Sequence, residues 1–396
     1  MEFADSLCRF GFFAFAIFSG FSITGAQISL GLSLIGLVFL LYKKAVFPKT
    51  SPLDRPFFFF ALAGVFSLAN ATNLFEGFRE LSKFLILIVF CIPYWFNIDR
   101  PLQRKILGTM IAFSVISSVA GLIKLFFFDV KVDRAYGFFS IPITFGECHA
   151  LFMLVTLSWL CAGEENRLSR FLLLISFFLQ GAGLLASFTR GARIGFGLGF
   201  CGLAFQHPRK LLSIAVTILI ACLLGAMFSG LVRERFKSFL ISAQSISPEN
   251  LKAEYRMRIW QIGMNVLENY PVFGVGMNNV KNWYKQYINP NDIKRKEVHG
   301  HLHNSFLQIL VMTGFFGFLA FWWFLFETGR FCFLLHSGIA DVWQASLAKG
   351  CIAFLFCFMG TGLTEYSFGD EEVAMLFFFL TGVFASPFRG ISANRG

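Results

Sequence analysis

Long apolar runs separated by short polar breaks recur from one end of this chain to the other. Each run is close to the roughly 20 residues that an α-helix needs to cross a bilayer. The pattern predicts about twelve transmembrane helices, at residues 9–24, 26–42, 56–70, 80–97, 104–128, 140–162, 168–187, 193–206, 210–230, 303–328, 345–366 and 371–388. The expected fold is therefore an all-α polytopic integral membrane protein that spans the lipid bilayer.

Lysine and arginine are distributed unequally between the two sets of polar breaks. The richer set comprises residues 43–55, 100–105, 167–170, 209–210, the segment around residue 330, and residues 389–395. The poorer set comprises residues 79–83, 131–134 and 190–193. Because short loops rich in Lys and Arg stay in the cytoplasm, we expect the richer set and both termini to be cytoplasmic.

One polar stretch, residues 231–302, is too long to be a simple turn between spans. Because nine spans precede it and the N-terminus is expected in the cytoplasm, we expect this stretch on the outer side of the membrane. It separates a first segment, 1–230, which holds nine spans, from a last segment, 303–396, which holds three. Within it, "AEYRMRIWQIGMNVLENYP" and "NNVKNWYKQYI" predict short helices, and "PVFGVGMNN" between them predicts a turn. The three segments form one integrated membrane domain, 1–396.

Charge and cysteine usage fit this organisation. Only 14% of the residues are charged and mean hydropathy is +0.66, whereas soluble domains average about 25% charged residues. The nine cysteines lie in or beside apolar runs without a CxxC pair, which indicates small buried residues. The N-terminal run lacks a basic region and a cleavage site, so we interpret it as a retained helix.

The 231–302 stretch holds eleven Lys or Arg against six Asp or Glu, a net charge of +5. On the outer face this charge favours an anionic partner such as a headgroup or a pyrophosphate. Simple anchoring on phospholipid explains most of these residues equally well. Nothing in the pattern indicates nucleic-acid binding.

The stretch "VHGHLHNSFLQIL" places His299, His301 and His303 at alternate positions just before an apolar run. An extended segment would direct all three to one face, as a zinc site requires, but no nearby Cys or Asp completes a tetrahedral set. We therefore expect no metal. Asn304 is a favoured helix N-cap. A histidine beside a helix N-terminus should stay neutral and could accept a proton from a hydroxyl.

Two pairs of arginines could bind an anion near these histidines. Arg190 and Arg193 lie in "SFTRGARIGFG" at the membrane rim, where the "TRGA" turn would let a phosphate approach backbone and guanidinium together. Snorkelling to the interface explains Arg193 equally well. Arg256 and Arg258 should open the helix "YRMRIW" and point in different directions, so at most one should face a given site. An arginine beside the histidine would also keep it neutral.

The order "SFTRGA", then "RxxxW" with "PVFGVG", then "HxHNSFLQIL…TGFFGFLAF" resembles the bacterial O-antigen ligase and Wzy polymerase family of membrane glycosyltransferases. The final "GTGLTEYSFGDEEVAMLFFFLTG" is also similar to the end of O-antigen ligases. The resemblance implies a GT-C-like membrane fold with a large periplasmic, partly helical loop. It also implies a Gram-negative inner-membrane location with the active site facing the periplasm.

The resemblance also implies a reaction and site residues. The family needs no metal, nucleotide or other cofactor; ligases transfer a polysaccharide from undecaprenyl pyrophosphate to the lipid A–core oligosaccharide in lipopolysaccharide biosynthesis. The motifs assign His303 as the base and Arg190 and Arg256 as the essential arginines. The lower-ranked binding candidates are Arg258, Arg193, His301, Arg134 and Asn304. The family-like stretch "DRAYGFFSIPITFGECHA" adds Glu147 and His149 as secondary candidates, although a polar helix end explains them as well.

Three other interpretations stay open at the level of sequence. A polymerase of the same family would extend the glycan instead of transferring it to lipid A–core. A polysaccharide-lipid transporter would carry ionisable residues near the bilayer midplane, whereas Lys124, one of the few charges within a span, lies near the outer end of its span. An accessory scaffold of an assembly complex would need none of the site residues.

Overall fold

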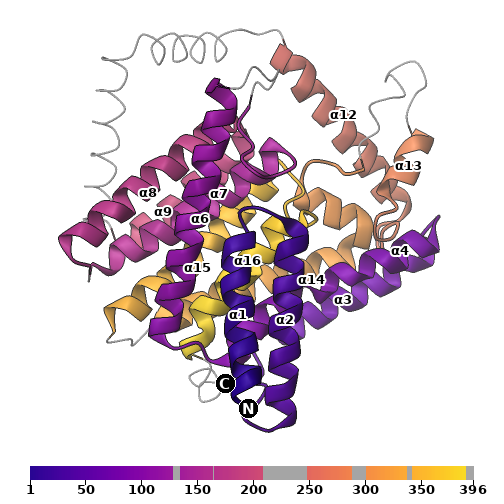
Figure 1. The fold of residues 1–396 in the computed structure, drawn as a ribbon. Coiled ribbons are helices and arrows are strands. Elements are labelled where there is room, and N and C mark those ends of the chain that lie inside the picture. Colours follow the sequence, from indigo (N-terminus) through magenta and orange to yellow (C-terminus); the bar gives the residue numbers. More distant parts are fainter. Residues whose placement is uncertain (128–133, 164, 208–247, 288–299, 337–340, 389–396) are drawn as a thin grey trace.

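The computed structural model describes residues 1–127, 134–163, 165–207, 248–287, 300–336 and 341–388. The described part of the chain is all-helical, without a strand. The predicted span at 210–230 and His299 lie outside the described residues. Figure 1 shows the N-terminus at one end of the helical assembly and α12 (Pro248–Asn269) at the opposite end.

Helices occupy every predicted span within the described residues. Their bounds are α1 Glu2–Phe18, α2 Ile23–Tyr42, α3 Asp54–Ser67 with the 3₁₀ turn η1 Leu68–Asn70, α6 Arg100–Phe127, α7 Pro142–Ala162, α8 Arg167–Ala186, α9 Arg190–Gln206, α14 Ser305–His336, α15 Val342–Gly362 and α16 Glu371–Ala385, followed by η4 Ser386–Phe388. Among the described helices, α2, α6, α7, α8, α14 and α15 are long and apolar enough to cross a membrane. The chain is therefore a multi-pass membrane protein; twelve spans and a GT-C-like fold remain predictions.

The predicted single span at 80–97 is wrong in detail. The structure has α4 (Leu74–Glu80), a 3₁₀ helix η2 (Leu81–Leu85) and then the short helix α5 (Ile86–Phe96), which contains Pro93. The polar residues at the start of this segment explain the interruption, because Lys83 pairs with Glu80 and donates to the Gly369 carbonyl at 3.4 Å. Asn97, at φ 62°, ends α5 in the left-handed conformation.

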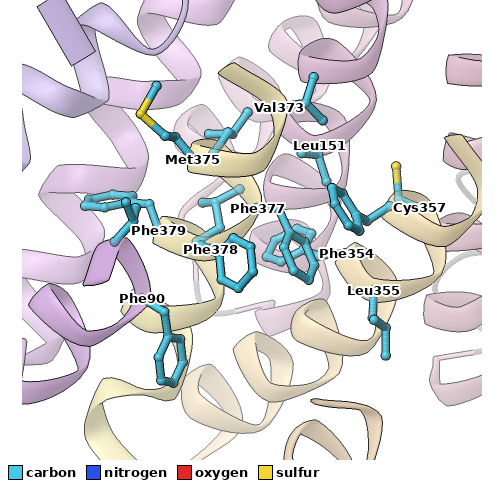
Figure 2. Packing of buried hydrophobic residues seen from close by; sticks show 14 of the residues in the cluster. Phe90, Leu151, Phe354, Leu355, Cys357, Val373, Met375, Phe377, Phe378 and Phe379 are labelled. Atoms are coloured by element: carbon cyan, nitrogen blue, oxygen red, sulfur yellow. The ribbon is translucent and has the colours of Figure 1, made fainter. Parts of the chain in front are cut away.

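The apolar core centres on α16, whose residues from Val373 to Ala385 are all buried. Figure 2 shows aromatic side chains of α16 packed against residues of α5, α7 and α15. The rings of Phe358 and Phe377 stack with centroids 4.5 Å apart and an interplanar angle of 14°. Offset stacking of this kind adds to the free energy gained by burying aromatic area. This core fixes α16 relative to α7 and α15.

A stripe of glycines on α9 packs against α15. Gly191, Gly195 and Gly199 recur every four residues and therefore share one face of α9. A Cβ at Gly195 would lie 2.8 Å from the Cys357 carbonyl oxygen, and one at Gly199 would lie 2.7 Å from that of Ala353. Close helix contact through small residues is the usual way that membrane helices associate. It brings the start of α9 against the end of α15.

The motif "PVFGVG", residues 271–276, fits into a break in α14. Gly314 has φ 65° and ψ −170°, so the regular backbone bonding of α14 is interrupted there. The amides of Val275 and Gly276 donate to the carbonyls of Val311 and Met312, at 3.1 and 3.0 Å. In return, the amide of Phe315 donates to the Pro271 carbonyl at 2.8 Å. The turn predicted from glycines is thus docked on the predicted tenth span.

The predicted loop helices are both present, as α12 and α13 (Val280–Tyr287). The expectation that Arg256 and Arg258 open the first of them is wrong, because α12 begins at Pro248. Both arginines lie beyond its first turn, where the helix dipole has largely lost its effect. Trp260 of α12 donates from Nε1 to the Leu302 carbonyl at 2.9 Å, which holds α12 over the start of α14.

Candidate functional site

The connection between α15 and α16, residues 363–370, is where the starts of several helices meet. Asn304, just before α14, donates from Nδ2 to the Leu363 carbonyl at 3.0 Å. At the start of α14, Ser305 donates to the Glu365 carbonyl, also at 3.0 Å. In α7, Thr144 donates to an Asp370 carboxylate oxygen at 2.6 Å. The glycine stripe places α9 beside the same connection, since Gly191 packs against Thr364.

His303 and Arg256 meet through a shared carboxylate. Oε2 of Glu365 lies 2.8 Å from Nδ1 of His303, and Oε1 accepts from a terminal nitrogen of Arg256 at 3.0 Å. Glu365 is only 8% exposed, so its carboxylate is largely shielded from bulk water, whereas the Arg256 side chain is 37% exposed. We expected an arginine directly beside the histidine, but the group between them is a carboxylate. An ionised carboxylate only accepts, so Nδ1 carries the hydrogen and Nε2 carries the lone pair that can accept a proton.

The backbone around His303 is unusual and well anchored. His303 adopts φ 50°, a left-handed conformation that costs a non-glycine residue on the order of 1 kcal/mol. The next residue, Asn304, caps α14 through a 2.9 Å bond from the Leu307 amide to its Oδ1, as predicted. Just before His303, the Leu302 amide donates to Oε1 of Gln308 at 2.8 Å. These bonds offset the strain and fix the ring's position.

A cavity of about 200 Å³ lies beside this arrangement. Its lining is formed by Ile141, Ile143, Glu147, His301, His303, Glu365, Tyr366, Ser367, Gly369 and Asp370. The His301 ring lies 4.3 Å from the His303 ring, centroid to centroid. Burial raises the pKa of Tyr366 and that of Asp370, although hydrogen bonds from Thr144 and two backbone amides partly offset the effect on Asp370. The cavity therefore holds several acidic groups and two imidazoles.

The arginines of the "SFTRGA" region form a basic group next to the cavity. Arg190 is exposed at the first position of α9, and Arg193 is half-buried one turn further on. Arg134 donates to the Ser187 carbonyl at 2.7 Å and to the Thr189 hydroxyl at 2.9 Å, directly before Arg190. Burial lowers the pKa of Arg134; the charge of Glu365 opposes this change and that of Arg193 adds to it. Arg134 is thus close enough to Glu365 and to Arg193 for their charges to act on it.

Three further candidates, Arg258, Asn304 and His149, do not face the cavity with a group left for a substrate in the same way as His303. Arg258 is exposed on α12, on a different side of the helix from the ion pair of Arg256. Asn304 uses both ends of its amide in the cap and in the bond to Leu363, which favours a positioning role over direct substrate binding. His149 is fully buried in the core, with its ring nitrogens 2.7 and 3.2 Å from two backbone carbonyls, so it is not part of this site.

The three-histidine zinc hypothesis lacks support in the described part of the chain. There, no group of three or more His, Cys, Asp or Glu side chains has the spacing of a metal site. His299 lies outside the described residues, so its relation to His301 and His303 stays untested.

Sequence reasoning missed Glu365. It lies in "GTGLTEYSFGDEE", which we noted only as similar to the end of O-antigen ligases, and it is 62 residues away from His303 in sequence. One signal was present: a glutamate at the very end of the predicted span 345–366, on the side of the membrane where we expect the histidines. Spacing alone could not pair it with His303 or Arg256.

Comparison with known proteins identifies a family match within the chain. Residues 175–322 match the family described as O-antigen ligase. This segment contains Arg190, Arg256, His303 and the docked "PVFGVG" turn. No curated protein matches the chain. Residues 175–322 of this multi-pass membrane protein therefore match the family that the motifs indicated.

Proposed function

We propose that this protein is an O-antigen ligase. It would transfer O-antigen polysaccharide from undecaprenyl pyrophosphate to the lipid A–core oligosaccharide at the periplasmic face of the inner membrane. The observation that supports this most is the bridge from His303 through Glu365 to Arg256, beside a cavity and a group of arginines. A transfer enzyme needs such a base next to an anion-binding region.

In the proposed reaction, His303 acts as the general base. Glu365 orients the ring, so that Nε2 takes the proton from the acceptor hydroxyl as its oxygen attacks the anomeric carbon of the donor. The bond between that carbon and the phosphate oxygen breaks, and undecaprenyl pyrophosphate leaves with the electron pair. A single displacement inverts the anomeric centre. All atoms and charges balance without a metal or other cofactor.

The arginines serve the leaving group in this proposal. Arg190, at the exposed start of α9, binds the pyrophosphate, with Arg193 and the amides of the helix start adding positive charge. Charge that develops on the leaving oxygen is stabilised by such fixed positive groups. Arg134 holds the turn that presents Arg190, and Arg256 holds Glu365.

The rival within the family is a polymerase, which would use the same residues on a different acceptor. Surface glycolipids of a deletion strain, separated on a gel, distinguish the two. Loss of a ligase leaves bare lipid A–core and accumulates lipid-linked polymer. Loss of a polymerase leaves core capped with single repeat units, and that pattern would contradict the proposal.

A transporter of lipid-linked glycans belongs to a different class. Lys124 lies near the end of α6, where its amine donates a hydrogen bond to the Gly137 carbonyl at 2.6 Å. A lysine bonded at a helix end does not favour an ion pathway through the membrane. Purified protein in detergent, given donor and acceptor without any gradient, should turn over if it is a transferase. A transporter would give no product under these conditions.

A further inference from the structure

Glu147 is a deeply buried carboxylic acid that faces the same cavity as His303. It lies in the second turn of α7, is 1% exposed, and lines the cavity of about 200 Å³. Neither carboxyl oxygen makes a hydrogen bond of ordinary geometry to a described residue: the Ser367 hydroxyl is near, but it donates to the Thr361 hydroxyl at 3.0 Å. Burying a polar group without hydrogen bonds costs several kcal/mol at most sites. Retaining such a group suggests a partner from outside the chain.

The other carboxylates of the cavity already have partners. Glu365 uses one oxygen for Arg256 and the other for His303. Asp370 accepts from Thr144 with one oxygen, and with the other it caps α16 by accepting from the amides of Glu372 and Val373. These two residues therefore hold the site together. Among the acidic residues of the cavity lining, Glu147 has the acceptor capacity left for a ligand.

The chemistry of the cavity favours a sugar. Both carboxyl oxygens of Glu147 can accept hydrogen bonds from hydroxyl groups, and hydroxyls are what a sugar ring presents at its edge. Ile141 and Ile143 supply apolar surface of the kind that packs against the carbon face of a sugar ring. A cavity of about 200 Å³ is smaller than most ligand pockets, which suits one ring at the end of a glycan better than a longer chain.

We propose that Glu147 accepts hydrogen bonds from hydroxyls of the acceptor's terminal sugar and so holds this sugar beside His303. The inference rests on the proposed transferase function and adds a specificity-determining residue to it. It divides the site into a basic side at Arg190, Arg193 and Arg134 for the donor pyrophosphate, and an acidic cavity for the acceptor. Like charge keeps the pyrophosphate out of the acidic cavity.

The test compares purified wild-type protein with Glu147→Gln and Glu147→Leu in detergent. Purified lipid A–core is the varied acceptor, and undecaprenyl-pyrophosphate-linked polysaccharide is the donor. Loss of the hydrogen bonds to the Glu147 carboxyl should raise the KM for lipid A–core roughly tenfold or more in Glu147→Leu, and less in Glu147→Gln. The KM for the donor should not change. Glu327→Gln is the matched control, because Glu327 lies near the far end of α14 from His303 and its carboxylate pairs with Arg330.

A thermal melt of the same samples separates this role from a structural one. Removing a buried carboxyl that lacks hydrogen bonds should raise the Tm of Glu147→Leu, whereas loss of a structural residue would lower it. An unchanged acceptor KM, a raised donor KM, or a lowered Tm would each overturn the inference. If the wild type itself makes no product, the proposed function fails, and the inference fails with it.

Discussion

Nδ1 of His303 lies 2.8 Å from Oε2 of Glu365, and this contact joins two segments that are 62 residues apart in sequence. The carboxylate is 8% exposed and is held from its other side by Arg256. A buried carboxylate in this position sets the tautomer and the orientation of an imidazole, as it does in other histidine-based catalysts. Glu365 is therefore a positioning residue for His303.

Glu365→Gln should lower kcat for transfer by roughly a hundredfold or more, because a neutral amide no longer fixes the tautomer of His303. Turnover of purified variant with saturating donor and acceptor measures the effect. The pH dependence of kcat should change as well, which a merely structural role would not cause. Glu371→Gln is the control. Glu371 is the first residue of α16, and its carboxylate accepts a hydrogen bond from Gln27 of α2 instead of contacting the site. Equal activity of the two variants would refute the positioning role.

The two neighbouring arginines of α12 should differ sharply. Arg256→Ala removes the partner of a buried carboxylate and should lower transfer roughly 10- to 100-fold. Arg258→Ala changes an exposed side chain and should retain most activity. Transfer rates of both variants, corrected for folded protein, measure the difference. If Arg258→Ala is the more severe variant, the ion pair between Arg256 and Glu365 is not the functional one.

Arg134→Lys should weaken donor binding. A lysine cannot bond both the Ser187 carbonyl and the Thr189 hydroxyl in the planar geometry of a guanidinium, so the turn before Arg190 would loosen. We expect a several-fold rise in the KM for the lipid-linked donor with little change in the KM for the acceptor. Arg170→Lys, at the exposed start of α8, serves as control. An unaltered donor KM would exclude this role.

The packing of α9 on α15 can be tested with two glycines of one helix. A Cβ at Gly195 would lie 2.8 Å from the Cys357 carbonyl oxygen, whereas one at Gly197 would meet nothing within 4 Å. Gly195→Ala should therefore destabilise the protein by about 1–3 kcal/mol, and Gly197→Ala should not. Thermal unfolding in detergent, together with the yield of folded protein, measures the difference. Similar stability in both variants would mean that α9 and α15 are not closely packed.

The helices were predictable because a membrane span has a required length and apolar composition, which the chain displays directly. The break at Leu81–Leu85 was not, since an apolar run does not reveal where a lysine will contact a distant carbonyl. The start of α12 was misplaced although the sequence carries a signal for it: Ser247 precedes Pro248, and a serine followed by a proline is a common helix start.

The site was predictable in part. The sequence placed His303 beside the start of the tenth span and predicted Asn304 as its N-cap, and both lie there. It placed Arg190 in a turn before the eighth span, whereas Arg190 is the first residue of α9. Glu365 and the cavity at Glu147 could not be located, because they depend on how α7, α14 and the α15–α16 connection meet. A single sequence does not show which distant segments lie close together in the fold. The docked "PVFGVG" turn is a similar case: its glycines predicted a turn, but not the break at Gly314 that receives it.

The most direct test of the account is single-turnover transfer by purified wild type and His303→Ala, each with and without EDTA. Undecaprenyl-pyrophosphate-linked polysaccharide and purified lipid A–core are the substrates, and the ligated glycolipid is quantified. The account predicts product with wild type whether or not EDTA is present, and a loss of roughly 10²–10⁴-fold with His303→Ala at unchanged expression and folding. Most of the wild-type rate in His303→Ala, or activity that EDTA removes and zinc restores, would contradict it.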